Sequence, residues 1–510
     1  MKSLKYIKCI VASILLSAFT IGCDDLDEPL QNQLPEEQID YTNSDDMVLL
    51  LYGAYGEFNH WQWESYPLLS VRGDDVNSGG YGDQQPFEAT DRYTYDRNYW
   101  MYNSVWLNLY NDIFLFNGLI NSVELYKANG ANEAISDQYI AEIKVMKAFE
   151  LLQLARTWGN ILVPETSVPE ELSETPLSTF DEAMQQISNM MDEAIPALPS
   201  VRPNQRTDVE GGITRYTALA VKAMANLEMK NFQEAADATG QIINSGAFSL
   251  YSDFYSLFKM PGELSNESLL EFQYSDFGQS TGTTVEYTTS YFGPPSSSWS
   301  PAVTGIGGGW GFYEPSLKYV KFMIDRNDQK RLTTSVIFTP AGISELQSDP
   351  NYSTLPAYIS TTTPDGDEFG DADRYNYLSG KHYLPSNQTT QDRPYASGKN
   401  LIAIRYSEVL LIHAEALVNG ANSTVMNAVD AINEVRGRAG LSSLGSVTLD
   451  DVLDEKYAEF GMEWGIRFAD MLRYNRENEL SYDGRTFSEE DRYLPYPLAQ
   501  LDLLPQLSGE

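Results

Sequence analysis

The sequence predicts a mostly α-helical protein, in which paired helices form a scaffold beside a loop-rich, strand-poor portion. Apolar side chains recur at helical spacing over much of residues 44–246 and again over residues 401–475. Between residues 247 and 400 the composition shifts to Tyr, Gly, Ser, Thr and Pro. An irregular segment of that size inside a compact domain is usually functional. We therefore expect a single domain over residues 44–510, with the ligand-binding surface mainly in residues 247–400.

A short apolar leader precedes this domain. Its three lysines are followed by an apolar run over residues 10–21, which is too short to cross a bilayer. We interpret residues 1–22 as a signal peptide and residues 23–43 as an acidic linker. Cys23 is the only cysteine outside the leader, so it is a candidate for lipid attachment at the new N-terminus. Two or three acyl chains at that position would hold the chain on a membrane.

Charge and cysteine content exclude several classes of function. The formal net charge is -38 at pH 7, with 72 acidic residues against 34 Lys and Arg. Such an acidic surface repels phosphate backbones, so we expect no nucleic-acid partner. A single remaining cysteine allows neither an intrachain disulfide nor a cysteine metal site.

Two helix pairs show the clearest periodicity. The first begins with residues 213–227 and ends at Gly246, and the second runs over residues 406–435 and is closed by Gly440. Small residues in the first pair would let its helices approach closely, as in tetratricopeptide-like hairpins. Further helices are expected over residues 44–58, 102–127, 136–157 and 178–195, and short strands over residues 268–274 and 333–338.

Several motifs occur in an order that is typical of one protein family. Residues 142–149 and 156–164 form a helix-and-turn motif, with Lys147 and Trp158 in place of the usual Arg and Tyr. Further motifs follow at residues 266–272, 405–416, 431–441, 459–473 and 493–497. Together they resemble the SusD/RagB family of outer-membrane glycan-binding lipoproteins, over nearly the whole chain after the leader.

The resemblance implies a SusD-like fold, with tetratricopeptide-like helix pairs as the scaffold and a loop-rich ligand region. It also implies capture of an oligo- or polysaccharide without cleavage, and delivery to a partner, a SusC-like TonB-dependent outer-membrane transporter. Residues 20–23 resemble the lipobox of bacterial lipoproteins, with Thr20 where Leu is usual. The acidic residues after Cys23 are similar to a signal for export to the outer face of the outer membrane, although a solvated linker is the alternative. The implied location is the outer membrane, lipid-anchored and exposed at the cell surface.

A glycan site needs flat aromatic side chains beside polar groups that bind hydroxyls, and two clusters in the sequence provide them. The candidate glycan-binding residues are Trp61, Trp63, Asp74, Asn77 and Tyr81 in the first cluster and Tyr291, Trp299 and Trp310 in the second. Trp299 is flanked by serines, so we expect its side chain to be exposed. Burial is the alternative for Trp61 and Trp63, which alternate as at a strand edge, and for Trp310, which has glycine on both sides.

Other aromatic residues favour the core. Trp100, Tyr102 and Trp106 lie where a helix begins, and their helical spacing indicates burial. The aromatic content favours a neutral glycan, and the negative net charge disfavours a polyanionic one, although local arginines could reverse that preference.

Three arginines in the family motifs are expected to form buried ion pairs rather than ligand contacts: Arg405, Arg436 and Arg467.

An acidic loop over residues 365–373 offers oxygen ligands that calcium would accept. The candidates are Asp365, Asp367, Asp371 and Asp373. Their spacing differs from the helix-loop-helix calcium motif, and a solvated turn is the alternative. No other cofactor and no other metal site is expected.

The sequence gives little support to catalysis. His60, His382 and His413 are the only histidines, and they form neither a pair at metal spacing nor a nucleophile-base set. We therefore expect a glycan-binding protein that is not an enzyme. Two alternatives remain open: a glycoside hydrolase that uses a carboxylate pair, and a tetratricopeptide-like scaffold or peptide receptor that binds no glycan.

Overall fold

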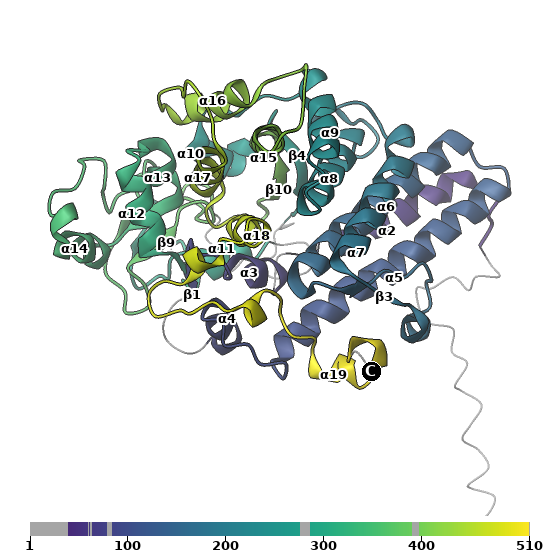
Figure 1. Cartoon of the computed structure of the whole chain (residues 1–510), viewed down its shortest axis with the longest axis horizontal. Helices are drawn as coiled ribbons and strands as arrows, with labels where there is room; N and C mark the ends of the chain where they lie inside the picture. Colours follow the sequence, from purple (N-terminus) through teal and green to yellow (C-terminus); the bar gives the residue numbers. More distant parts are fainter. Residues whose placement is uncertain are drawn as a thin grey trace, which may run out of the picture.

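The computed structural model describes residues 39–59, 61, 64–78, 84–275, 286–389 and 397–508. The leader, Cys23 and most of the linker lie outside the described residues, as do Trp63 and Tyr81, so what we expect of them stays a prediction. The fold is mostly helical, as predicted, and each sheet in the described part of the chain consists of two short antiparallel strands (Figure 1).

Helices of the first half pack side by side in chain order, from α5 to α6, α7, α8 and α9 (Figure 1). Their bounds are α2 (Met47–Phe58), α5 (Trp100–Ala128), α6 (Glu133–Trp158), α7 (Phe180–Ala194), α8 (Arg215–Glu228) and α9 (Phe232–Asn244). The C-terminal helices are α15 (Tyr406–Val418), α16 (Ala428–Ala439), α17 (Leu449–Phe460) and α18 (Ile466–Arg473). Because α15 packs on both α9 and α16, the two predicted parts of the scaffold form one continuous row of helices.

Local signals set the ends of these helices. Thr179 caps α7 by accepting from the Glu182 backbone N–H at 3.3 Å, and the Glu182 carboxylate accepts from the Thr179 N–H at 2.8 Å. Gly440 follows α16 with a left-handed φ of 81°, as predicted for a C-terminal cap. Ala218, Ala223 and Ala225 of α8 are fully buried, which lets neighbouring helices approach α8 closely.

Residues 247–400 contain more helix than predicted. The helices of this segment are α10 (Phe254–Leu257), α11 (Thr288–Phe292), α12 (Leu317–Asp325), α13 (Gln329–Ser335) and α14 (Pro340–Ser348). Figure 1 shows α12, α13 and α14 at the end of the molecule opposite α5 and α6.

One of the two predicted strands is present, and the other is present only in its second half. Residues 268–274 contain β4 (Ser268–Phe272), which pairs with β10 (Leu401–Arg405). The strand predicted over residues 333–338 is wrong in its first half, because Thr333 and Thr334 belong to α13. Their hydroxyls donate to the carbonyls four residues earlier at 2.9 and 2.8 Å, an arrangement that lets a helix accommodate β-branched residues. Only β7 (Val336–Phe338) is strand, paired with β9 (Tyr377–Ser379).

The other α-helices and strands of the described residues are short. They are α3 (Ser65–Ser70), α4 (Gln85–Asp91) and α19 (Leu498–Leu501), and the strand pairs β1 (Val76–Ser78) with β6 (Tyr313–Pro315), β2 (Ile161–Leu162) with β3 (Leu177–Ser178), and β5 (Trp299–Ser300) with β8 (Glu368–Phe369).

Burial at the start of α5 differs from the prediction in one position. Tyr102 and Trp106 are fully buried, as predicted, but the prediction that Trp100 lies in the core is wrong, because its side chain is 63% exposed. Trp100 shares a helical face with Leu107, seven residues on, which is also exposed. Tyr102 and Trp106 lie on a different, buried face of α5.

The three predicted ion pairs are present, and Arg405 and Arg467 are buried as predicted, whereas Arg436 is half-buried. Arg405 pairs with Glu463 at 3.0 Å, Arg436 with Glu455 at 3.0 Å, and Arg467 with Asp74 at 2.8 Å. The first pair joins β10 to the segment after α17, the second joins α16 to α17, and the third joins α18 to the loop after α3. Within the described ranges, no helix has the length and apolarity that a membrane span requires.

Candidate functional site

The first predicted cluster is largely buried. Trp61 is only 2% exposed and packs edge-on against Phe149 and Trp464, with ring centroids 5.7 and 5.6 Å apart. Asp74 is fully buried and accepts from Arg467 at 2.8 Å and from Lys318 at 2.5 Å. The expectation that these two side chains contact a ligand is therefore wrong for the described conformation, because core packing and two cations occupy them.

Trp299 is also buried, contrary to prediction. Its side chain is 7% exposed and lies in a small core with Phe369 and Tyr383, whose ring centroid is 6.1 Å from that of Trp299. The neighbouring Ser298 is buried and its hydroxyl is hydrogen-bonded to Tyr375, whereas Ser296, Ser297 and Ser300 are exposed around the buried ring. Most side chains of this core come from residues 369–383, with Ile306 and Ile337, so the burial of Trp299 depends mainly on segments distant in the sequence.

Trp310 and Tyr291 belong to an aromatic cluster between α4, α11 and β6, in which Trp310 and Phe312 form the outer part and Tyr291 is buried. The cluster contains Phe87, Tyr291, Phe292, Trp310, Phe312 and Tyr313. Tyr291 is 6% exposed, whereas the side chains of Trp310 and Phe312 are half-buried. The Trp310 and Phe312 rings lie 5.4 Å apart at an interplanar angle of 32°. The guanidinium of Arg374 lies 5.0 Å from the Phe312 ring centroid.

We call Trp310, Phe312 and Arg374 the aromatic surface. Its position depends on glycines that bring backbone segments together. A Cβ at Gly308 would lie 2.4 Å from the Pro294 carbonyl oxygen, so only glycine fits there. Backbone bonds from the Trp310 N–H to the Ser290 carbonyl and from the Phe312 N–H to the Tyr291 carbonyl, 2.7 and 2.8 Å long, hold the segment against α11.

Polar groups lie next to the aromatic cluster. The pairing of β1 with β6 places Asn77 opposite Glu314, one residue from Tyr313. The Asn77 side-chain oxygen accepts from the Tyr482 hydroxyl at 2.7 Å and from Arg485 at 3.0 Å. Burial raises the pKa of Glu314 to about 7, against the opposing effect of N–H groups that donate to it.

Trp100 is an exposed aromatic side chain, although its helical spacing predicted burial. It lies at the same end of the molecule as the aromatic surface, since the neighbouring Tyr102 hydroxyl is 2.7 Å from that of Thr90 on α4. The ring of Phe87, which is also on α4, lies 6.3 Å from the ring of Tyr291 in the aromatic cluster. Phe312 and Arg374 were also missed. The alternation of Trp310 and Phe312 within a glycine-rich run is the signal that could have found Phe312.

The acidic loop is held by protein donors. Asp367 is buried and accepts from the backbone N–H groups of Ala302 and Ser386 at 2.7 and 2.9 Å. Asp365 accepts from the Tyr255 hydroxyl at 2.6 Å, and Asp371 from the Ala341 N–H at 2.6 Å. Across the described residues, no three His, Cys, Asp or Glu side chains are grouped so that they could hold a metal ion. Calcium binding by this loop, including Asp373, stays a prediction.

Comparison with known proteins relates this chain to the SusD family. The model of the SusD family matches residues 266–498. The SusD-like protein P2 of Formosa agariphila is 26% identical over 506 residues, which is 92% of this chain and 91% of the relative. The resemblance to the SusD family is confirmed.

Solved structures show that the SusD-like fold extends over the whole domain. A laminarin-binding SusD-like protein has a TM-score of 0.75 at 19% identity, with 90% of this chain and 97% of that chain covered. Surface glycan-binding protein A from Bacteroides thetaiotaomicron, in complex with laminarihexaose, has a TM-score of 0.71 at 21% identity, with the same coverage of 90% and 97%. The region matched by the family model contains β4, β10, α15 to α18 and the ion pairs of Arg405 with Glu463 and of Arg436 with Glu455.

Proposed function

We propose that this SusD-like protein captures an oligo- or polysaccharide at the aromatic surface and delivers it to a SusC-like TonB-dependent transporter, without cleaving it. The observation that carries the proposal is the half-buried pair Trp310 and Phe312, presented on a SusD-like scaffold with Arg374 beside it. A flat aromatic side chain binds the apolar face of a sugar ring, and a guanidinium donates to its hydroxyls.

The strength expected of such a surface suits polymer capture. Covering roughly 100 Å² of one aromatic side chain contributes about 2.5 kcal/mol before ordering costs. Two neighbouring rings and one guanidinium therefore give modest affinity per sugar, and a long chain gains from several weak contacts. Trp100 is an additional exposed ring at the same end of the molecule.

Two relatives with bound or named glycans support a saccharide ligand, since one is described as laminarin-binding and the other holds laminarihexaose. Their low identity leaves the choice of glycan to experiment. The lipid anchor at Cys23, the outer-membrane location and the transporter partner are part of the proposal, and they rest on the leader and on the family resemblance.

Affinity electrophoresis in gels that contain single polysaccharides tests the aromatic surface. Trp310→Ala should weaken retardation by the retained glycan roughly 5- to 30-fold, because one platform contributes about 1 to 2 kcal/mol after ordering costs. Trp310→Phe should keep most of the binding. Tyr52→Ala is the matched control, since Tyr52 is 49% exposed on α2, away from the aromatic surface.

The outcomes separate the three functions. If Trp310→Ala and Tyr52→Ala behave alike with every retained glycan, the site assignment is wrong. If no glycan retards the wild-type protein, a scaffold or peptide receptor becomes the better hypothesis. Shortening of a polysaccharide by the purified protein, measured from product sizes, would contradict capture without cleavage.

A further inference from the structure

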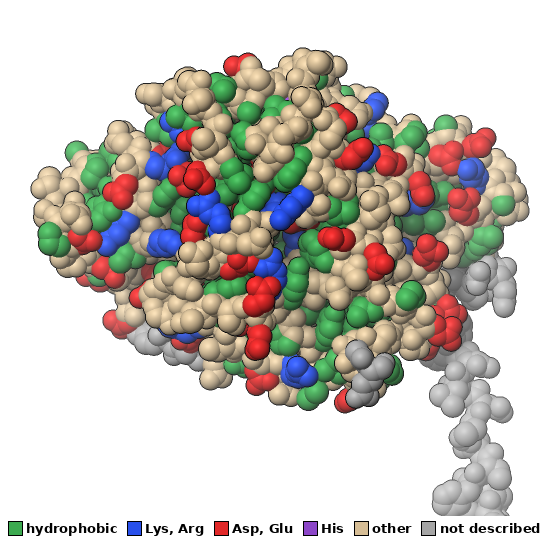
Figure 2. All heavy atoms as spheres, viewed as in Figure 1, with side chains coloured by type: hydrophobic (Ala, Val, Ile, Leu, Met, Phe, Trp, Pro, Cys, Tyr) green, Lys and Arg blue, Asp and Glu red, His purple; other side chains and the backbone are tan. Residues whose placement is uncertain are grey.

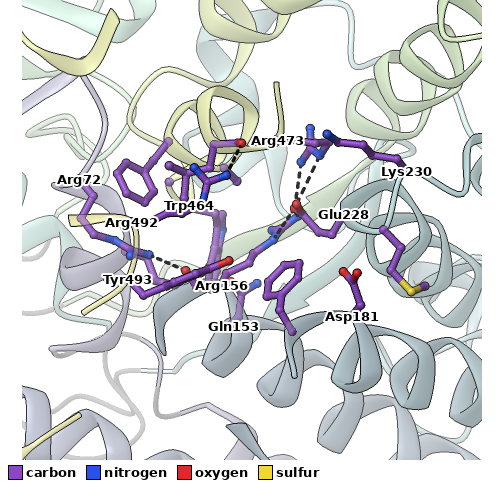
Figure 3. A pocket seen from close by; sticks show the side chains of 17 residues that line it. Arg72, Gln153, Arg156, Asp181, Glu228, Lys230, Trp464, Arg473, Arg492 and Tyr493 are labelled. Carbon is purple, nitrogen blue, oxygen red and sulfur yellow. Dashed lines mark hydrogen bonds and ion pairs between the residues drawn. The ribbon is translucent and has the colours of Figure 1, made fainter. Parts of the chain in front are cut away.

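A second candidate site lies apart from the aromatic surface, in a cavity of about 290 Å³ between α3, α6, α7, α8 and α18 (Figure 3). Its walls combine aromatic and basic side chains. The aromatic ones are Phe180, Trp464, Phe468 and Tyr493, and the charged ones are Arg72, Arg156, Asp181, Glu228, Lys230, Arg473 and Arg492. Basic side chains also reach the surface around α18 on the face shown in Figure 2.

The charge of this cavity is opposite to that of the whole protein. Five basic side chains line it against two acidic ones, in a chain with a net charge of -38. Glu228 is already neutralised, since it accepts from Arg156 at 3.0 Å and from Arg473 at 2.9 Å. Burial acts to raise the pKa of Glu228, but the charges of Arg473 and Arg156 outweigh burial and lower that pKa to about 2. Arg473 also pairs with Glu415 and Asp470, and Arg492 pairs with Glu477, so the excess of positive charge in the cavity comes from Arg72 and Lys230.

Arg72 supplies the decisive feature. It is 2% exposed, and its Nη2 donates to the Arg156 carbonyl at 3.1 Å, while its guanidinium stacks on Phe468 at 4.4 Å. Its Nε and Nη1 have no hydrogen-bond partner, and no ion pair joins Arg72 to a carboxylate in the described part of the chain. Nε carries one N–H and Nη1 carries two, so three of the five donors are unused. A buried cation with unused donors is costly unless an anion completes the site.

The rim of the cavity can hold a ring next to that cation. Phe180 and Tyr493 are half-buried, with ring centroids 6.1 Å apart, and Lys230, which also lines the cavity, is exposed. Figure 3 shows Arg72 and Tyr493 on one side of the cavity and Lys230 on the other. A sugar that carries an oxyanion could place its ring against the aromatic side chains and its charge toward the guanidinium.

We propose that this cavity is a binding site for an acidic saccharide, which presents the oxyanion of a carboxylate or sulfate group to Arg72, while Lys230 adds a second positive charge on the other side of the cavity. The choice of a saccharide rests on the proposed function, whereas the oxyanion rests on the cavity alone. The protein would then bind neutral sugar rings at the aromatic surface and a charged unit at a separate position. The negative net charge argued against a polyanionic ligand, and the local arginines reverse that expectation.

Titration calorimetry with the full folded domain tests the site. The probes are a galacturonate oligomer, a sulfated galactose oligomer, a neutral galactose oligomer of the same length, and inorganic sulfate. At least one acidic oligomer should bind, and the neutral oligomer should bind at least about tenfold more weakly at this cavity. Binding of the acidic oligomer should weaken as salt rises.

Variants then assign the binding to the cavity. Lys230→Glu reverses an exposed charge at the rim and should weaken the binding of the acidic oligomer at least about tenfold. Lys330→Glu is the matched control, because Lys330 is also exposed and lies outside the cavity. Arg72→Lys keeps the charge but loses the planar donors, and it should weaken binding in a protein whose circular dichroism matches that of the wild type.

Each result decides the question. If no acidic oligomer binds, or if Lys230→Glu and Lys330→Glu bind it equally, the proposal is overturned. Binding of inorganic sulfate without either acidic oligomer would overturn the saccharide assignment. Trp310→Ala separates the two sites: it should leave the acidic oligomer unaffected, so a failure of the aromatic surface would be seen independently of a failure of this cavity.

Discussion

Glu459 contacts three arginines that come from separate parts of the chain. Arg331 of α13 lies 3.1 Å from its carboxylate, and Arg405 and Arg438 also pair with it. All four side chains are buried. Burial acts to raise the pKa of Glu459, but the charges of Arg438, Arg405 and Arg331 outweigh burial and hold that pKa well below its usual range. Glu459 thus links three buried cations, each of which also pairs with at least one other carboxylate.

Glu459→Gln should lower the free energy of unfolding by about 3 to 5 kcal/mol, because three buried guanidinium groups lose the one carboxylate that they share. Denaturant unfolding followed by circular dichroism measures the change. Glu193→Gln is the control, since the Glu193–Lys144 pair is largely exposed and should change stability by less than about 1 kcal/mol. A loss for Glu459→Gln as small as for the control would show that the network is not needed for stability.

At the level of single elements, two glycines of α16 have opposite roles. Gly440 ends the helix at a φ of 81°, a conformation that is strained for other residues. Gly437 lies within the helix, and a Cβ there would meet no atom within 4 Å. The first glycine is required by the backbone, and the second only adds flexibility to the unfolded chain.

This contrast gives a paired prediction. Gly440→Ala should destabilise the protein by about 1 kcal/mol, and Gly437→Ala should stabilise it by about 0.4 to 1 kcal/mol. Thermal unfolding of the two variants beside the wild type would reveal the opposite signs. Equal shifts in the same direction would mean that the left-handed cap does not set the end of α16.

At the scale of the whole molecule, the sequence revealed the features that depend on local patterns. The helix pairs α8–α9 and α15–α16 follow from periodicity, and the buried role of Arg405 follows from its motif. The candidate site was harder to predict because exposure depends on packing between distant segments. Trp299 is covered by residues 369–383, and Trp61 is covered by Phe149 and Trp464. Arg72 shows no sequence signal at all, since its unused donors become visible only in the cavity.

The titration of buried carboxyl groups makes the stability of the whole molecule depend on pH. Several carboxyl groups lie where burial outweighs their hydrogen bonds. Burial raises the pKa of Glu314 and of Glu408 to about 7 and that of Asp75 to about 6. These groups bind protons in the folded state at a pH where the unfolded chain has released them. Their contribution to stability is therefore fully present below about pH 4 and is lost as the pH rises toward 7.

Glu228, Glu455 and Glu459 titrate in the opposite direction, because arginine charges outweigh burial and lower their pKa values. Their contribution is lost as the pH falls below the ordinary carboxyl range. The two groups of carboxyls together predict a maximum of stability in mildly acidic solution, at about pH 4 to 6.

Glu314→Gln isolates one of these contributions. The amide oxygen can still accept from the Asn376 and Tyr377 N–H groups, which donate to Glu314 at 2.9 and 3.2 Å, but the side chain no longer titrates. Between pH 4.5 and pH 7.5 the wild type should lose up to about 3 kcal/mol more stability than the variant, from a shift of roughly two pKa units. Urea unfolding at a series of pH values measures both curves. Parallel curves for the wild type and the variant would contradict a raised pKa at Glu314, and with it the assignment of a buried, protonated carboxyl beside the aromatic cluster.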